Sequence, residues 1–255
     1  MATIKTGQNG KKYVEPTTVD SIFHATDGNS KTGNCGNYNL PIELTCNHSC
    51  ECYKLGNCYA CHGCYNFISN QIKYAENYNF FMKNESIVFI NEIINYITSN
   101  KLEKFRYFTC GDIPNTRFFQ CMIAIAKRLP NVKFWAYTKK YHIINNYCDT
   151  FGINSIPSNL VIIFSHWLNE DGTYFSMNNK YNFPTSEFIP FGKEYLTATV
   201  NHICPCSDPT VKATCDTCKT PCYELKHGQS MALLEHSTTR TKQRDKAIKE
   251  AKQAL

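Results

Sequence analysis

The sequence predicts an α/β protein built on a mostly parallel sheet, and three observations carry this prediction. Short apolar segments alternate with amphipathic ones through the middle of the chain, as they do in repeated βαβ units. The segment LVIIFS at 160–165 is apolar at nearly every position, which is typical of a strand buried on both faces. Each predicted strand is followed by polar or reactive side chains, and the carboxyl ends of parallel strands form one functional edge.

The elements expected from periodicity divide the chain into three regions. Residues 1–36 are polar and are interpreted as an N-terminal arm, with at most a short strand at 21–25. Residues 37–200 form the α/β domain, and residues 201–255 form a cysteine-rich element followed by a basic helix. A first strand is expected over 37–44, ending at or shortly after Pro41. The remaining expected elements are helices at 67–82, 84–99, 115–129 and 141–147 and strands at 104–109, 132–138, 160–165 and 196–200.

Composition restricts the class of protein. The 255 residues suit one large domain with or without a small satellite, and no apolar run is long enough for a transmembrane helix. The N-terminus has no apolar signal-peptide core, so we expect a reducing cytoplasm, where clustered thiols indicate metal or redox chemistry. The net charge of +6 is concentrated partly in the tail after Ser237. That tail is either a solvated helix or a contact for nucleic acid.

Eleven of the fifteen cysteines lie in two short windows, a density that core packing does not require. The first window contains Cys46, Cys50, Cys52, Cys58, Cys61 and Cys64, and the second contains Cys204, Cys206, Cys215, Cys218 and Cys222. Closely spaced thiolates converge on one soft metal centre, either tetrahedral zinc or an iron–sulfur cluster. Six thiols in one loop exceed the need of a single zinc ion, which favours an iron–sulfur cluster in the first window. Zinc and a second cluster are equal alternatives for the second window.

Candidate ligand-binding residues follow two of the predicted strands. Cys110, Gly111 and Asp112 follow the strand at 104–109, and Thr138 and Lys139 end the strand at 132–138. A glycine lets the backbone approach a ligand closely, and a carboxylate accepts hydrogen bonds from a ribose or an amino group. The ammonium group of Lys139 could bind a carboxylate or a phosphate. The alternatives are a tight turn that caps the next helix and a lysine exposed at a helix start.

The order of these motifs resembles the phage-encoded gene-product-88-like family, which is grouped with radical S-adenosylmethionine (SAM) enzymes through spore photoproduct lyase-like relatives. The resemblance rests on NLP at 39–41 before Cys46, FRYFTCGD at 105–112, YTKKY at 137–141 and the cysteine pairs of the second window. It implies a partial (β/α) barrel, an open relative of the TIM barrel, with a cysteine-rich metal-binding extension at the C-terminus.

The same resemblance implies a [4Fe–4S] cluster at the barrel mouth, with SAM as its ligand. By position, Cys46, Cys61 and Cys64 are the cluster ligands, Cys58 is a substitute for one of them, and residues 110–112 face SAM. The C-terminal cysteines hold an auxiliary metal site. Both thiol windows are then expected to meet at the open end of the strand-and-helix domain.

Three functions are open on these grounds. The first is a radical SAM-type enzyme with an external electron donor, an unidentified small-molecule or nucleic-acid substrate and no membrane association, in the cytoplasm of a bacterial host. The second is a metal-stapled nucleic-acid-binding protein, and the third is an iron–sulfur protein that only transfers electrons. The first window reads Cys46-x3-Cys50 and Cys58-x2-Cys61-x2-Cys64, whereas radical SAM enzymes usually carry CxxxCxxC, so the third function stays open.

Overall fold

The structure is a computed structural model that describes residues 2–28, 32–54, 58–167, 178–189, 200–208 and 211–234, without the side chains of Glu51 and Tyr59. The strand expected at 196–200 and the basic C-terminal helix fall outside these residues, except for Val200. All statements below refer to the described part.

Its centre is an eight-stranded sheet in which seven neighbouring strands run parallel. In sheet order the strands are β3 (Ala25–Thr26), β4 (Gly36–Tyr38), β5 (Lys104–Tyr107), β6 (Lys133–Thr138), β7 (Leu160–Trp167), β8 (Thr185–Ile189), β10 (Ser230–Leu234) and β9 (His202–Ile203). Only β3 is antiparallel to its neighbour, β4. The sheet is open, with β3 and β9 as its edges, so the expected α/β class with a parallel sheet is confirmed, and the described sheet does not close into a barrel.

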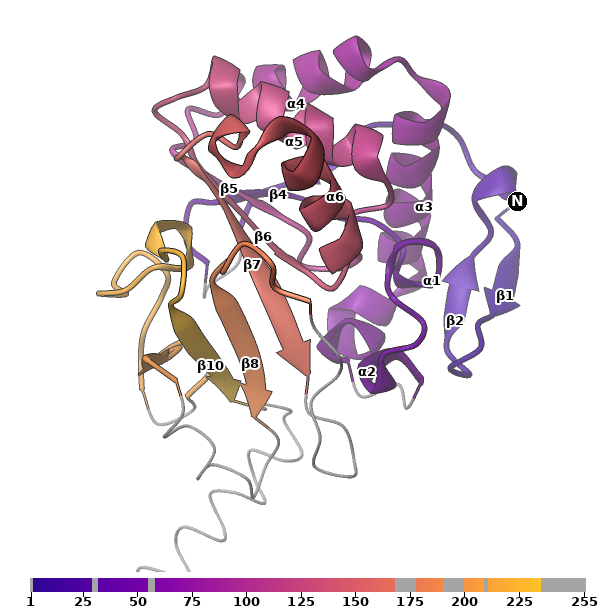
Figure 1. Ribbon diagram of the computed structural model, residues 1–255. Coiled ribbons are helices and arrows are strands. Elements are labelled where there is room, and N and C mark those ends of the chain that lie inside the picture. Colours follow the sequence, from indigo (N-terminus) through magenta and orange to yellow (C-terminus); the bar gives the residue numbers. More distant parts are fainter. Residues whose placement is uncertain are drawn as a thin grey trace, which may run out of the picture.

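Four helices cover one face of the sheet (Figure 1). They are α3 (Ile68–Lys83), α4 (Ser86–Ser99), α5 (Thr116–Arg128) and α6 (Tyr141–Phe151). Strand alternation sends Phe105 and Tyr107 into this helical core, where they pack with Phe118 and Phe134. The Asn115 side chain accepts a hydrogen bond from Phe118 N–H at 3.0 Å and caps α5, as the sequence predicts.

The opposite face of the sheet, here called the inner face, carries a smaller core. Trp135 and Ile163 point to this side, where Leu225, Met231 and Cys35 pack against them. The segment that contains the second cysteine window therefore lies against the inner face, beside β10 (Figure 1). It includes a short 3₁₀ turn, η6 (Cys222–Glu224), which contacts both β6 and β7.

The N-terminal arm is more ordered than the sequence predicts. It forms a hairpin of β1 (Ile4–Thr6) and β2 (Lys12–Val14), then the 3₁₀ turn η1 (Pro16–Thr18). The buried Asn79 side chain of α3 lies within hydrogen-bond distance of three carbonyls of this arm, those of Pro16, Val19 and Asp20. Side-chain amides anchor the arm, and a search for apolar periodicity does not detect such anchors.

Several element boundaries also differ from expectation. The first strand ends at Tyr38, because Pro41 lacks an N–H and instead precedes a short helix, α1 (Ile42–Thr45). Helix α6 extends to Phe151, four residues beyond the predicted end, and stops at Gly152 with φ 76°. Strands β8 and β10 were not expected. The remaining short elements are α2 (Glu51–Lys54), η2 (Tyr59–Cys61), η3 (Gly63–Asn66) and η4 (Ile153–Ser155).

Candidate functional site

A cavity of about 110 Å³ lies at the carboxyl ends of β5, β6, β7 and β10, under the loop of the first cysteine window. In Figure 1 this loop, with α1 and α2, lies at the end of the domain toward which the arrows of β7, β8 and β10 point. Five thiols line the cavity, those of Cys46, Cys52, Cys58, Cys61 and Cys110. The polar part of the lining contains Arg106, Asp112, Thr138, Lys139 and Ser165. The structure thus brings the strand-end residues predicted from sequence to one place.

The chain at the end of β5 is fixed by one buried amide. The Asn39 Oδ1 atom accepts hydrogen bonds from Thr109 N–H at 2.8 Å, from the Thr109 hydroxyl at 2.8 Å and from Cys110 N–H at 3.0 Å. Phe108, just before this loop, has a φ of 60°, a conformation that non-glycine residues rarely adopt. Because strain of this kind persists only where surrounding contacts enforce it, the amide sets the position of the Cys110 thiol.

Gly111, the next residue of the same turn, allows the backbone to pass close to Leu40. Its φ is 89°, and a Cβ atom there would lie 2.5 Å from the backbone oxygen of Leu40. The Leu40 N–H donates to the carbonyl of Cys110 at 3.0 Å, which fixes the distance between the two segments. Only glycine fits this position without moving the backbone.

Asp112 ties β5 to β6. Its Oδ1 accepts from the Thr138 hydroxyl at 2.6 Å and from Ile113 N–H at 2.7 Å, and its Oδ2 accepts from Lys139 N–H at 2.9 Å. Burial raises the pKa of the Asp112 carboxyl, and these three donors oppose the shift. Asp112 and Thr138 are therefore engaged with the protein itself, which makes them positioning residues. Their predicted contact with a ligand remains a prediction.

Two cations face the cavity. The Lys139 ammonium donates to the Ser165 hydroxyl at 3.1 Å and lies 5.4 Å from the centre of the Trp167 ring. Burial lowers the pKa of Lys139, but the neighbouring cysteines Cys52, Cys50 and Cys58 outweigh that effect and raise it. The Arg106 guanidinium lies 5.0 Å from the centre of the Tyr137 ring.

The thiols of the first window differ in their surroundings. The sulfurs of Cys50 and Cys52 are 3.2 Å apart, and both are buried. The hydrogen bond from Cys50 lowers the pKa of Cys52 to about 7, with further help from the Lys139 ammonium, whereas the pKa of Cys50 is raised. The hydrogen bond with Cys61 and burial raise the pKa of Cys58. Cys64 is exposed and does not line the cavity.

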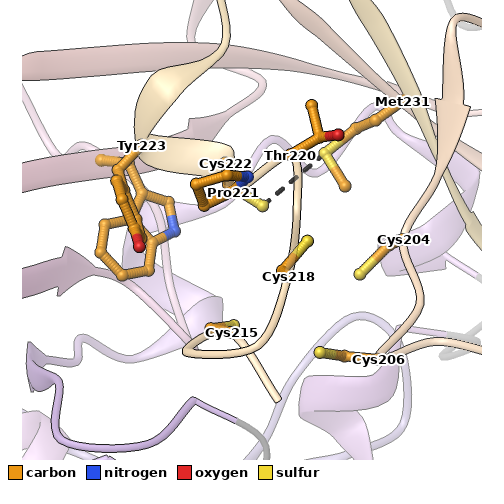
Figure 2. Close-up of a pocket in the computed structure, with 10 residues that line it drawn as sticks. Cys204, Cys206, Cys215, Cys218, Thr220, Pro221, Cys222, Tyr223 and Met231 are labelled. Carbon is orange, nitrogen blue, oxygen red and sulfur yellow. Dashed lines mark hydrogen bonds between the residues drawn. The ribbon is translucent and has the colours of Figure 1, made fainter. Parts of the chain in front are cut away.

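The second window forms a separate and much smaller cavity on the inner face (Figure 2). No residue lines both cavities. The expectation that both windows meet at the open end of the domain is therefore wrong, because the second window lines its own cavity against the inner face, beside Trp135 and Met231. Tyr137 lies between the two groups of thiols, since it lines the first cavity and donates its hydroxyl to Cys222 Sγ at 2.8 Å.

All fifteen cysteines are described, and all are free thiols. Within the described residues, no three or more Cys, His, Asp and Glu side chains could hold a metal ion as they stand. The donor set, however, is almost purely thiol, and thiolates suit zinc and iron. Ligation at either window therefore requires cysteine side chains to rotate toward a shared centre. The other thiols, Cys35, Cys121 and Cys148, are buried packing residues.

Sequence reasoning missed Arg106, Tyr137 and Leu233, and placed Cys110 with the ligand residues although its thiol joins those of the first window. The signal for Arg106 was available, because strand alternation in KFRY sends Phe105 and Tyr107 to one face and Arg106 to the other. No comparable signal existed for Leu233, since β10 was not predicted.

Fold and site together define an α/β protein with an open parallel sheet and a thiol-lined cavity at its carboxyl edge. The family model for Gene product 88 matches residues 5–182, and the chain belongs to this family, which fits the expected phage origin. No curated protein and no solved structure shows detectable similarity to the chain. No described helix has the length and apolar character needed to cross a bilayer.

Proposed function

We propose that the chain is an iron–sulfur enzyme of the radical SAM type. In this proposal a [4Fe–4S] cluster is held by three of the four thiols Cys46, Cys52, Cys58 and Cys61, which line one cavity at the carboxyl edge of the sheet. That convergence of thiols from one loop is the observation that carries the proposal. When bound, the cluster supplies the electron for the reductive cleavage of SAM, a chemistry that belongs to the cofactors.

The chain's own residues support this use of the cavity in two ways. The predicted ligand Cys64 is exposed, so the geometry favours Cys58 in its place, which matches the substitution considered from sequence. The lining of the cavity also includes Lys139, whose ammonium is suited to the carboxylate of SAM.

The test is analysis of iron, sulfide and electron paramagnetic resonance on anaerobically purified full-length protein, with and without SAM. We expect a brown protein that absorbs near ~400 nm, as thiolate-held clusters do, and a resonance signal that SAM alters. The triple variant Cys46→Ser/Cys58→Ser/Cys61→Ser should lose the iron, whereas the matched variant Cys121→Ala, changed in the helical core, should keep it. A colourless wild type without iron would refute the proposal.

A second measurement separates SAM chemistry from simple electron transfer. Lys139→Met should keep the cluster but weaken SAM binding by about tenfold or more, because a charge-assisted hydrogen bond is lost. The exposed Lys127→Met should leave binding unchanged. An iron-containing wild type that neither binds nor cleaves SAM would point to an electron-transfer protein, the alternative that the unusual cysteine spacing favours.

A further inference from the structure

The five thiols of the second window are not equivalent. Figure 2 shows Cys204, Cys206, Cys215 and Cys218 around one space, whereas Cys222 points toward Met231. The Cys222 Sγ accepts the Tyr137 hydroxyl at 2.8 Å and lies 3.8 Å from the Met231 sulfur. Cys222 lines the same small cavity as the other four thiols and, like Cys204, packs against the inner-face core. It differs from them because its sulfur is engaged by Tyr137 and Met231.

The four thiols come from two turns that the backbone holds in place. The first turn carries Cys204 and Cys206. It is joined to β10 by Cys204 N–H donating to the Ala232 carbonyl at 2.8 Å and by Leu234 N–H donating to Ser207 Oγ at 3.0 Å.

The second turn carries Cys215 and Cys218. It is closed by Thr217 N–H donating to the Thr214 carbonyl at 3.1 Å and by Thr214 N–H donating to Thr217 Oγ1 at 3.0 Å. Cys215 and Cys218 have the usual spacing of a structural zinc pair, and a longer spacer separates them from Cys204 and Cys206, which lie one residue closer together than usual.

The volume of the space bears on the choice between one zinc ion and an iron–sulfur cluster. The space among these thiols is about 10 Å³, against about 110 Å³ under the first window. Roughly 10–15 Å³ is the least that accommodates a single water molecule, so the smaller space suits one ion rather than a cluster of several irons and sulfides.

We propose that Cys204, Cys206, Cys215 and Cys218 form a closed, tetrahedral thiolate site for one zinc ion, and that Cys222 is not a ligand. Rotation of the cysteine side chains toward a shared centre would complete the site. Four thiolates and one zinc ion leave a net negative charge, which the Arg106 guanidinium near Cys215 offsets. The ion pair between Lys104 and Asp216, the residue after Cys215, connects the second turn to β5.

The zinc ion would act as a staple that holds the 204–222 segment on the inner face of the sheet. Apart from the Trp135 contacts, this segment has few large apolar side chains, so metal ligation supplies stability that packing does not. The proposal is independent of the iron–sulfur cluster, because the two sites share no thiol and take different metals.

The test is metal analysis of the full-length protein and its variants. We expect about one zinc ion per wild-type chain, with X-ray absorption showing four sulfur neighbours at about 2.3 Å. Cys215→Ser/Cys218→Ser should lose the zinc, and Cys222→Ala should keep it. The variant Cys46→Ser/Cys58→Ser/Cys61→Ser should also keep it, even where its iron is lost, so failure of either site is recognised separately.

The wild-type protein keeps the proposal testable where a variant fails to fold. Replacement of the bound metal by Co²⁺ should give the intense visible absorption of a tetrahedral thiolate site. Wild-type protein without zinc, iron in this site, fewer than four sulfur neighbours, or zinc lost from Cys222→Ala would each overturn the assignment.

Discussion

Replacing Gly111 with alanine tests whether close backbone approach positions the end of β5. The φ of 89° is a conformation that costs an L-residue about 1–2 kcal/mol. The new Cβ would also lie 2.5 Å from the Leu40 carbonyl oxygen, and relieving such overpacking costs roughly 1–3 kcal/mol. Together these effects predict a loss of about 2–5 kcal/mol in the free energy of unfolding. At about 2–4 °C per kcal/mol for a chain of this size, the melting temperature falls by roughly 4–20 °C.

Gly10→Ala is the matched control, because Gly10 also has a positive φ, 72°, but no atom within 4 Å of the added Cβ. It should lose only the conformational part, about 1–2 kcal/mol. Thermal and urea unfolding followed by circular dichroism measure both variants. Equal losses in the two would refute the reasoning, since they would show that the Leu40 carbonyl does not confine the turn.

Three further predictions concern contacts around the two cavities. Asn39→Leu removes the acceptor of three donors and should lower the free energy of unfolding by about 2–4 kcal/mol in urea titrations, against less than about 0.5 kcal/mol for the exposed Asn95→Ala. Tyr137→Phe removes the hydrogen bond to Cys222 and should lower the free energy of unfolding by about 1 kcal/mol, while the zinc content stays constant. Loss of zinc from this variant would contradict the placement of Cys222 outside the zinc site. Lys104→Met should lower the free energy of unfolding by less than about 1 kcal/mol, and this loss should shrink as the salt concentration is raised. A loss that does not depend on salt would show that the ion pair with Asp216 is not its cause.

Most of the helices and parallel strands, and the edge of the sheet at which the candidate site lies, could be predicted from the sequence alone. Helices α4 and α5 follow from apolar stripes, and α3 follows from aromatic residues at helical spacing. Strands β6 and β7 follow from their apolar character, because burial within a sheet selects apolar side chains. The prediction that strand ends share one edge is confirmed, since Cys110 and Lys139 line the same cavity. The docking of the N-terminal arm could not be predicted from apolar periodicity, because the arm is anchored by the side-chain amide of Asn79.

The sequence by itself determined that this is an α/β protein with two thiol-dense windows, because periodicity and cysteine spacing are local properties. Only the tertiary structure decided that the windows occupy different cavities and that Cys222 stands apart from its neighbours. Those outcomes depend on the register and order of β10 and β9, which place the second window against Trp135 through pairings between residues far apart in the chain. Such pairings are set by packing of the whole sheet, and no short stretch of sequence contains them.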